Sequence, residues 1–232
     1  MKILAVLLRW LIVLCIPIVL IGTGLRLILL PQFLQVEYRM PHFPPDTYGF
    51  STADRLHWAS LTWRYLVDPG DAASLAVLTF GDGSPLFNER EVSHMADVKA
   101  VIQMALAAWI AALALLTAAA VLSWRAGRLV EYRRALRDGG WLTIGLAGSI
   151  GVTVALGMVA NPAIFWEFFT VFHGLFFQGD SWLFAYSDTL IRLFPIRFWQ
   201  DTFLAAALIV LGGGAALAFG VRRTASLPID AR

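Results

Sequence analysis

The chain has 232 residues, 59% of them hydrophobic, and a formal net charge of +2 at pH 7. So much apolar content excludes an ordinary soluble domain and is typical of an integral membrane protein, while the near-neutral charge gives no reason to expect nucleic-acid binding. Because Cys15 is the only cysteine, we expect neither an internal disulfide nor a cysteine metal site.

Four stretches of the sequence are apolar and long enough to cross a bilayer, which takes about 20 predominantly apolar residues. They are residues 10–30, 101–124, 142–160 and 203–221. The first is too long for the roughly 7 to 15 apolar residues of a cleaved signal, and no small-residue cleavage site follows it. These stretches predict a mainly α-helical integral membrane protein with four transmembrane helices and a small extracytoplasmic cap of helices and a short hairpin.

Positive charge is concentrated in one connection. Residues 125–141, between the second and third stretches, contain five arginines, and further basic residues flank the two ends of the chain. The positive-inside rule therefore predicts that residues 125–141 form an Arg-rich cytoplasmic loop and that both termini are cytoplasmic. On this plan residues 1–30 form the first transmembrane helix, residues 31–100 and 161–202 are two extracytoplasmic cap segments, and residues 203–232 form the last helix and a cytoplasmic tail.

The predicted orientation puts most carboxylates and all the histidines outside. Apart from Glu131, Asp138 and Asp230, every Asp and Glu lies in an extracytoplasmic segment, as do all four histidines. The interiors of the spans contain no Lys, His or carboxylate, which disfavours a pump or an ion-coupled transporter. Any chemistry is therefore expected on the outer side of the membrane.

The first cap segment begins with several prolines, which predict an irregular start. Residues 51–54 (STAD) resemble a capping box, which starts a helix, and residues 68–70 (DPG) end it. Residues 76–80 and 86–87, with the turn 81–85 between them, predict a short hairpin.

Asn88, followed by Glu91 three residues later, predicts the start of a second helix. Residues 89–124 contain no helix breaker, so this helix is expected to project from the membrane by about three turns, with His94 just above the surface. Glu91 and Asp97 lie three residues on either side of His94 and share its helical face, where they could orient or charge-stabilise the imidazole. The alternative is a solvated helix face with incidental ion pairs.

The second cap segment is crowded with aromatic side chains. They are Phe165, Trp166, Phe168, Phe169, Phe172, Phe176, Phe177, Trp182, Phe184, Tyr186, Phe194, Phe198 and Trp199. Such density suits amphipathic segments that lie at the boundary between headgroups and acyl chains. His173, Asp180, Asp188 and Arg192 lie among these rings, and ionisable groups in a partly dry setting are candidates for catalysis.

No motif of a serine hydrolase, a zinc protease or a phosphate-binding loop occurs in the sequence. What remains is a pair of histidines, His94 and His173, one from each cap segment. Two imidazoles near neutrality can take a proton from one oxygen or nitrogen and return it to another, as acyl transfer requires. A substrate held among aromatic side chains at the interface would be a lipid or a lipidated peptide.

Two other functions fit the same residues. One is a non-catalytic membrane scaffold or lipid-binding protein, in which the aromatic segment binds lipid or helices and the histidines serve only in packing. The other is a metal-dependent lipid hydrolase with His94, His173, Asp180 and Asp188 as ligands. Chelator sensitivity would identify the hydrolase, and activity on a diacylated lipopeptide would exclude the scaffold.

Three blocks of the sequence carry a resemblance to a known family. They are residues 87–99 (FNEREVSHMADVK), 172–184 (FHGLFFQGDSWLF) and 187–195 (SDTLIRLFP). Together with the four-span plan and its outer cap, they resemble the bacterial lipoprotein intramolecular transacylase family, Lit. Membership implies moving an acyl chain from the glyceryl sn-2 ester of an N-terminal diacylglyceryl-cysteine to that cysteine's own amino group, which gives a lyso-form lipoprotein.

The resemblance also implies a location and partners. It implies a multi-pass protein of the bacterial cytoplasmic membrane whose active site faces outward. The expected partners are a diacylated lipoprotein substrate and membrane lipids. We expect no cofactor, no metal and no nucleic acid.

The resemblance further implies roles for particular residues. The family's two catalytic histidines fall on His94 and His173. We assign the general base to His94 because of its carboxylate neighbours, which leaves His173 to steady the oxyanion or protonate the leaving alkoxide. The candidate substrate-binding residues are Asn88, Arg90, Asp97, Phe172, Phe176, Asp180, Trp182, Asp188 and Arg192. For Asp180 and Arg192 the alternative is ion pairing within the cap.

Overall fold

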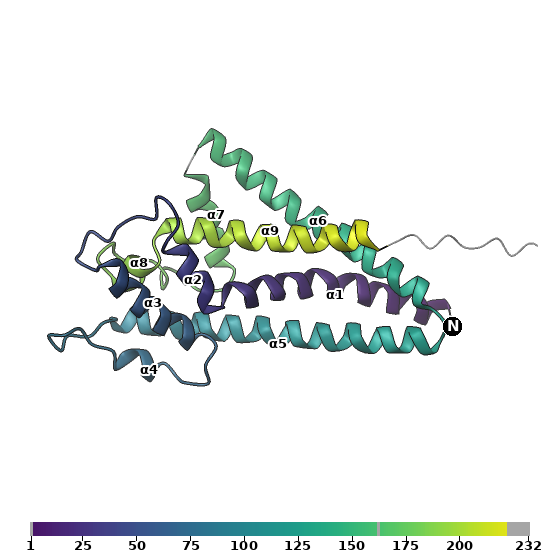
Figure 1. Ribbon diagram of the computed structural model, residues 1–232, viewed down its shortest axis with the longest axis horizontal. Coiled ribbons are helices and arrows are strands. Elements are labelled where there is room, and N and C mark those ends of the chain that lie inside the picture. Colours follow the sequence, from purple (N-terminus) through teal and green to yellow (C-terminus); the bar gives the residue numbers. More distant parts are fainter. Residues whose placement is uncertain (1, 162, 222–232) are drawn as a thin grey trace, which may run out of the picture. The chain divides into compact units, whose positions relative to one another are not determined.

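The described part of the chain is built from helices and connecting loops. The computed structural model describes residues 2–161 and 163–221. Its helices are α1 (Lys2–Ile28), α2 (Pro31–Glu37), α3 (Thr52–Tyr65), α4 (Ala73–Ala76), α5 (Glu89–Arg125), α6 (Leu129–Ala160), α7 (Ile164–Gly174), α8 (Thr189–Leu193) and α9 (Ile196–Gly220) (Figure 1). Four of them, α1, α5, α6 and α9, are long and apolar enough to cross a membrane. The predicted mainly α-helical fold with four transmembrane helices is therefore confirmed.

The segment expected as an Arg-rich loop is largely helical. Helix α6 begins at Leu129, so that only residues 126–128 of the expected loop 125–141 form the turn after α5. Gly127 has a φ of +68°, and the N–H of Arg128 donates to the carbonyl five residues earlier at 2.7 Å. A left-handed glycine with this bond ends a helix and lets the next begin at once.

The chain divides into two compact units. The first unit comprises residues 2–23, 108–152 and 207–221, and the second unit comprises Gly24–Ala107 and Thr153–Ala206. Helices α1, α5, α6 and α9 contribute residues to both units. All the predicted catalytic and substrate-binding residues belong to the second unit, so the fold of that unit decides the geometry of the site.

Small and aliphatic side chains form the core of the first unit. Its buried residues include Ile12, Ile16, Ala112, Leu116, Ala119 and Ala135. Glycine allows α6 and α9 to approach closely, because a Cβ at Gly140 would lie 2.7 Å from the carbonyl oxygen of Gly214. Such close backbone contact is a common way to pack helices in membranes.

The core of the second unit is larger and more aromatic. Its buried residues include Leu34, Trp63, Leu86, Met95, Leu193 and Phe198. Trp63 packs edge-on against Phe198, with ring centroids 5.5 Å apart, and its Nε1 donates to the Ile28 carbonyl at 3.1 Å. The indole thus fills the core while its polar atom is satisfied. Phe165, Phe169 and Trp182 form a further buried cluster in the same unit.

Helix α3 begins with the predicted capping box. The N–H of Asp54 donates to the Ser51 hydroxyl oxygen at 3.1 Å, and the N–H of Ser51 donates to the Asp54 carboxylate at 3.0 Å. Both backbone donors are therefore satisfied at a helix end that would otherwise leave them without partners. This sequence-based prediction is confirmed.

The predicted hairpin does not form two strands. Its first part overlaps α4, and in the following turn Thr79 and Pro85 form an isolated antiparallel bridge. The turn itself is present, closed by a bond from the Phe80 N–H to the Ser84 carbonyl at 2.8 Å. Pro85 has no N–H with which to extend a ladder. The prediction of strands over residues 76–80 and 86–87 was therefore wrong.

Candidate active site

Helix α5 carries the first histidine of the predicted pair. Its start is fixed as the sequence predicted, because the N–H of Glu91 donates to the Asn88 side-chain oxygen at 3.0 Å and the N–H of Asn88 donates to Glu91 Oε2 at 2.8 Å. The helix then continues as one unbroken ribbon (Figure 1). This reciprocal cap places His94 in the second turn of a rigid element.

Glu91 also joins α5 to α8. Glu91 is 1% exposed, and its second oxygen, Oε1, accepts a hydrogen bond from the Leu190 N–H at 2.7 Å. The hydroxyl of the neighbouring Thr189 donates to the Leu86 carbonyl at 2.5 Å. A buried carboxylate is tolerated when its oxygens are bound in this way, and here it ties together the starts of two helices.

The carboxylates expected to orient His94 do not contact it. Both oxygens of Glu91 accept from backbone N–H groups, and Asp97 is exposed. No hydrogen bond joins either carboxylate to His94 within the described residues. Spacing of three residues does put side chains on one helical face, but the Glu91 carboxylate turns toward the helix starts. The expectation that either carboxylate orients the imidazole by direct contact was therefore wrong.

His94 of α5 and His173 of α7 face one another. Their ring centroids are 6.4 Å apart, with the ring planes inclined by 24°. The two residues are 8% and 7% exposed. Two side chains from distant parts of the sequence are thus close enough to act on one functional group of a substrate.

The backbone of α7 fixes the tautomer of His173. Its Nδ1 lies 2.8 Å from the Phe169 carbonyl oxygen, one turn earlier in the helix. Since a carbonyl oxygen only accepts, Nδ1 carries the hydrogen, and in the neutral ring Nε2 keeps its lone pair. Burial lowers the pKa of His173, although the hydrogen bond to Phe169 opposes this change. The neutral ring, with Nε2 as the free base, is therefore favoured.

His94 lies in apolar surroundings. The centroid of its ring lies 4.9 Å from that of Phe177 and 5.4 Å from that of Phe184. Its Nδ1 is buried and finds no hydrogen-bond partner among the described residues. Such an atom costs about 1–3 kcal/mol, and in a native protein it calls for an explanation. A polar group of a bound substrate would satisfy it.

Aromatic rings enclose His173. The rings of Phe169 and Trp182 lie 4.0 and 4.6 Å from it between centroids, and Trp182 is 7% exposed. Phe172, 5.7 Å from His173, packs on Phe176 at 5.2 Å, and Phe176 is 47% exposed. The aromatic residues around His173 are therefore buried at Trp182 and exposed at Phe176. Such a continuous apolar surface suits an acyl chain.

Arg90 holds the segment that carries Trp182. Its Nη2 donates to the carbonyl oxygens of Asp180 and Leu183 at 3.2 and 3.0 Å, and its guanidinium lies 5.9 Å from the centroid of Phe184. The predicted residues Arg90 and Asp180 are thus brought together, but through the backbone of Asp180. Arg90 therefore contributes to the position of the aromatic wall.

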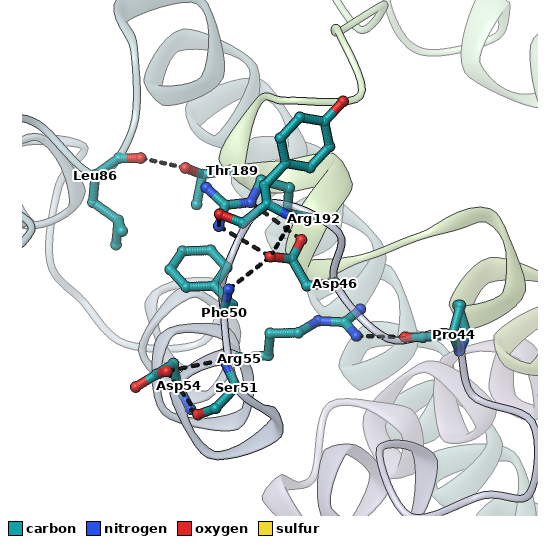
Figure 2. A network of polar contacts seen from close by, with 10 residues as sticks. Pro44, Asp46, Phe50, Ser51, Asp54, Arg55, Leu86, Thr189 and Arg192 are labelled. Carbon is teal, nitrogen blue, oxygen red and sulfur yellow. Dashed lines mark hydrogen bonds and ion pairs between the residues drawn. The ribbon is translucent and has the colours of Figure 1, made fainter.

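Arg192 is engaged elsewhere in the second unit. Its Nε and Nη2 donate to the two carboxylate oxygens of Asp46 at 3.2 and 3.1 Å, and its guanidinium lies 3.7 Å from the centroid of Phe50 (Figure 2). This is the ion pair within the cap that the sequence left open as an alternative. Sequence reasoning missed Asp46, because no local pattern connects partners that are 146 residues apart.

The side chains do not support the metal-dependent alternative. No group of three His, Cys, Asp or Glu residues within residues 2–161 and 163–221 could hold a metal ion. Asp188 Oδ2 accepts a hydrogen bond from the Ala185 N–H at 2.8 Å, while Asp180 is exposed. The two aspartates therefore do not join His94 and His173 in a ligand cluster.

The fold and the site together define a class of protein, a membrane protein with four helices long enough to span a bilayer and two buried histidines that face one another among aromatic side chains. Comparison with known families shows which family it belongs to. The model of the family "Lipoprotein intramolecular transacylase Lit" matches residues 10–199. Since the match covers most of the sequence, the chain belongs to this family, and it is an integral membrane transacylase.

The chain is also similar to individual proteins, and the solved structures among them share its fold. The membrane integral lipoprotein intramolecular transacylase Lit from Bacillus cereus has a similar structure, with a TM-score of 0.63, 19% identity and coverage of 94% of both chains. A variant of that protein with a histidine replaced by arginine gives a TM-score of 0.61 and 16% identity, covering 95% of this chain and 91% of the other. An uncharacterized protein of Aquifex aeolicus (strain VF5) is 28% identical over 200 residues, which is 83% of each chain.

Proposed function

We propose that the enzyme transfers an acyl chain from the glyceryl sn-2 ester of an N-terminal diacylglyceryl-cysteine to the amino group of the same cysteine. The product is a lyso-form lipoprotein. The observation that carries this proposal is the facing pair of buried histidines, His94 and His173, with ring centroids 6.4 Å apart. The other two histidines of the chain, His42 and His57, are exposed.

The reaction is a balanced exchange within one substrate. The cysteine nitrogen attacks the ester carbonyl, a C–N bond forms, the C–O bond to the glyceryl oxygen breaks, and the amine proton ends on that oxygen. Neither water nor a cofactor is consumed. Because nucleophile and ester belong to one molecule, the enzyme must mainly fold that molecule into a reactive geometry, and confinement by aromatic walls such as Trp182 supports this.

We assign the general base to His173, the reverse of the sequence-based assignment. Its Nδ1 hydrogen is bound to the Phe169 carbonyl, which leaves Nε2 to accept the proton of the attacking amine and return it to the leaving oxygen. His94 then donates an N–H to the oxyanion of the tetrahedral intermediate. The carboxylates that favoured His94 as base do not contact it.

The test replaces each histidine with alanine and reads the N-terminus of a lipoprotein from the same cells by mass spectrometry. Wild-type cells should give an acylated amino group and a glyceryl that has lost one chain. His94→Ala and His173→Ala should leave the diacylglyceryl form, while His57→Ala, at an exposed position, should behave as wild type. Lyso-form product at the wild-type rate from either single variant contradicts the proposed roles.

We also propose that both termini are cytoplasmic and that the histidine pair faces outward. The arginines around residues 125–141 support this orientation through the positive-inside rule. A reporter fused after Arg134 should read cytoplasmic, and one inserted near Gly83 should read external. The opposite pair of results would place the histidines on the wrong side for a lipoprotein that has crossed the membrane.

A further inference from the structure

The second unit contains a cavity built around two arginines. Its volume is about 330 Å³, which is within the range of pockets that bind small ligands. Six of its lining residues carry the argument: Pro44, Asp46, Tyr48, Arg55, Tyr186 and Arg192. Figure 2 shows Arg192 facing Asp46, with the Arg55 side chain running toward Pro44. The residues come from the loop before α3, from α3 itself and from α8 with its flanking loop.

Asp46 is fully engaged by its neighbours. Besides the two bonds from Arg192, Asp46 Oδ2 accepts from the N–H groups of Phe50 and Tyr48 at 2.7 and 3.1 Å. Burial alone would raise the pKa of Asp46, but the hydrogen bonds from Arg192 and Phe50 lower it below its ordinary value. The carboxylate is therefore charged, and its charge is matched by Arg192.

Arg55 has no such partner. Arg55 is 4% exposed, and its Nη1 donates to the Pro44 carbonyl at 2.6 Å. Its Nε is buried without a hydrogen-bond partner, and no carboxylate in the described part of the chain lies within ion-pair distance of its guanidinium. The rings of Tyr38 and Phe43, at 5.3 and 5.0 Å, add cation–π contacts but no full negative charge.

The cavity therefore carries one positive charge in excess, two guanidinium groups against one carboxylate. A buried charge is costly unless a counter-charge accompanies it. Planar guanidinium groups bind phosphate and carboxylate oxygens through paired hydrogen bonds. The cavity is thus short of one anion, and a guanidinium is the group best suited to hold it.

We propose that this cavity is a binding site for a phosphate-type anion, with Arg55 as its charge partner. The source is either the headgroup phosphate of an anionic phospholipid or free phosphate. The exposed rings of Tyr186 and Tyr48 at the cavity, 83% and 51% exposed, are typical of side chains at a membrane interface and suit the lipid source. The site involves neither catalytic histidine.

The test measures lipid binding to the purified full-length protein in neutral detergent by native mass spectrometry. The probes are phosphatidylglycerol, phosphatidylcholine and inorganic phosphate. Arg55→Gln should weaken phosphatidylglycerol binding about tenfold or more, as expected for a lost charge-assisted hydrogen bond. Arg64→Gln, which changes an exposed arginine of the same helix, should not. Phosphatidylcholine should bind equally to both variants and to wild type.

A second variant tests the site independently, in case Arg55→Gln does not fold. Thr47→Trp fills the cavity without removing a charge, since Thr47 lines it, and it should weaken phosphatidylglycerol binding as strongly. Thr52→Trp, at an exposed position, is its control. Wild-type affinity in folded Arg55→Gln or in Thr47→Trp overturns the proposal, as does a wild-type protein that binds neither phosphatidylglycerol nor phosphate.

Two further measurements separate the remaining outcomes. If millimolar inorganic phosphate displaces phosphatidylglycerol or binds alone, the free anion is the ligand. If phosphate does neither, the lipid headgroup is the ligand. Both results support the site. Acyl transfer on a diacylated lipopeptide is measured in the same preparations. Its absence with lipid binding intact would count against the proposed function and leave the anion site standing.

Discussion

The two units differ in how they bury polar groups. In the first unit the buried polar side chains among the described residues are the hydroxyls of Ser123 and Thr143, and Thr143 donates to a carbonyl of its own helix at 2.9 Å. In the second unit most are ionisable: Glu37, Arg55, Glu91, His94, Lys99 and His173. Lys99 illustrates the consequence, because its ammonium donates to the carbonyls of Asp68 and Gly70, which belong to another segment of the chain.

This difference shows in which unit the chain can accommodate the free-energy cost of buried ionisable groups. A hydroxyl bonded to its own helix costs little in a membrane, whereas a buried ionisable group requires partners from other elements. The second unit supplies such partners for Glu91 and Lys99, but His94 keeps a nitrogen without one. A buried polar atom without a partner is rare in native proteins, and in the described part of the second unit Glu37, Arg55 and His94 each have one.

The largest effect is expected when the two buried histidines of the second unit are removed. Each single alanine variant should lose about 10² to 10⁴ in rate, the usual loss for a general acid or base. The variant that lacks both His94 and His173 should be little slower than either single one, because residues that act as one unit lose activity non-additively. Kinetics on a diacylated lipopeptide test this, and additive losses would show that the two rings work independently. The melting temperature should fall little.

Replacing Glu91 should affect both activity and stability. In Glu91→Gln the side chain keeps one acceptor oxygen, so the N–H of either Asn88 or Leu190 loses its partner, at a cost of about 1–3 kcal/mol. Turnover should fall because α8 and the segment before it are no longer fixed to α5. Glu89→Gln, at an exposed position near the start of the same helix, is the matched control. If thermal unfolding and kcat are the same in both variants, the bridge between the helices is unimportant.

A substitution in the first unit should change stability alone. Gly140→Ala places a methyl group against the Gly214 backbone, and overpacking of this kind costs about 1–3 kcal/mol. Gly145→Ala in the same helix meets nothing within 4 Å and should stabilise by about 0.5–1 kcal/mol. Unfolding measurements should separate the two variants, while activity per folded molecule stays the same. A loss of kcat in folded Gly140→Ala would show that the first unit shapes the site.

The smallest predicted effect is on the pH profile. Because burial lowers the pKa of His173, the neutral base persists below the ordinary histidine pKa of about 6.5, and kcat/KM should fall only at lower pH. Because His173 acts as a base, kcat/KM should rise as the pH increases through the pKa of His173 and should then become constant. Ring ¹⁵N chemical shifts should show the hydrogen of His173 on Nδ1. A hydrogen on Nε2 would return the base to His94, and an acid limb centred above about 6.5 would contradict the lowered pKa of His173.

The sequence by itself determined the features that depend on local pattern. Apolar runs of membrane-spanning length predicted the four long helices, since burying hydrocarbon in lipid requires only composition and length. The helix starts at Ser51 and Asn88 were also predictable, because a capping box consists of bonds between residues three apart. Three motif blocks indicated the family, and two of them contain the candidate histidines.

Only the tertiary structure decided what those residues contact. That Glu91 binds the start of α8, that Arg192 pairs with Asp46, and that the Phe169 carbonyl fixes the tautomer of His173 depend on where backbone groups lie in space. No spacing in the chain encodes the 6.4 Å between the two imidazole rings. The choice of base therefore had to come from hydrogen bonds, because the direction in which a buried side chain turns is set by the donors and acceptors around it.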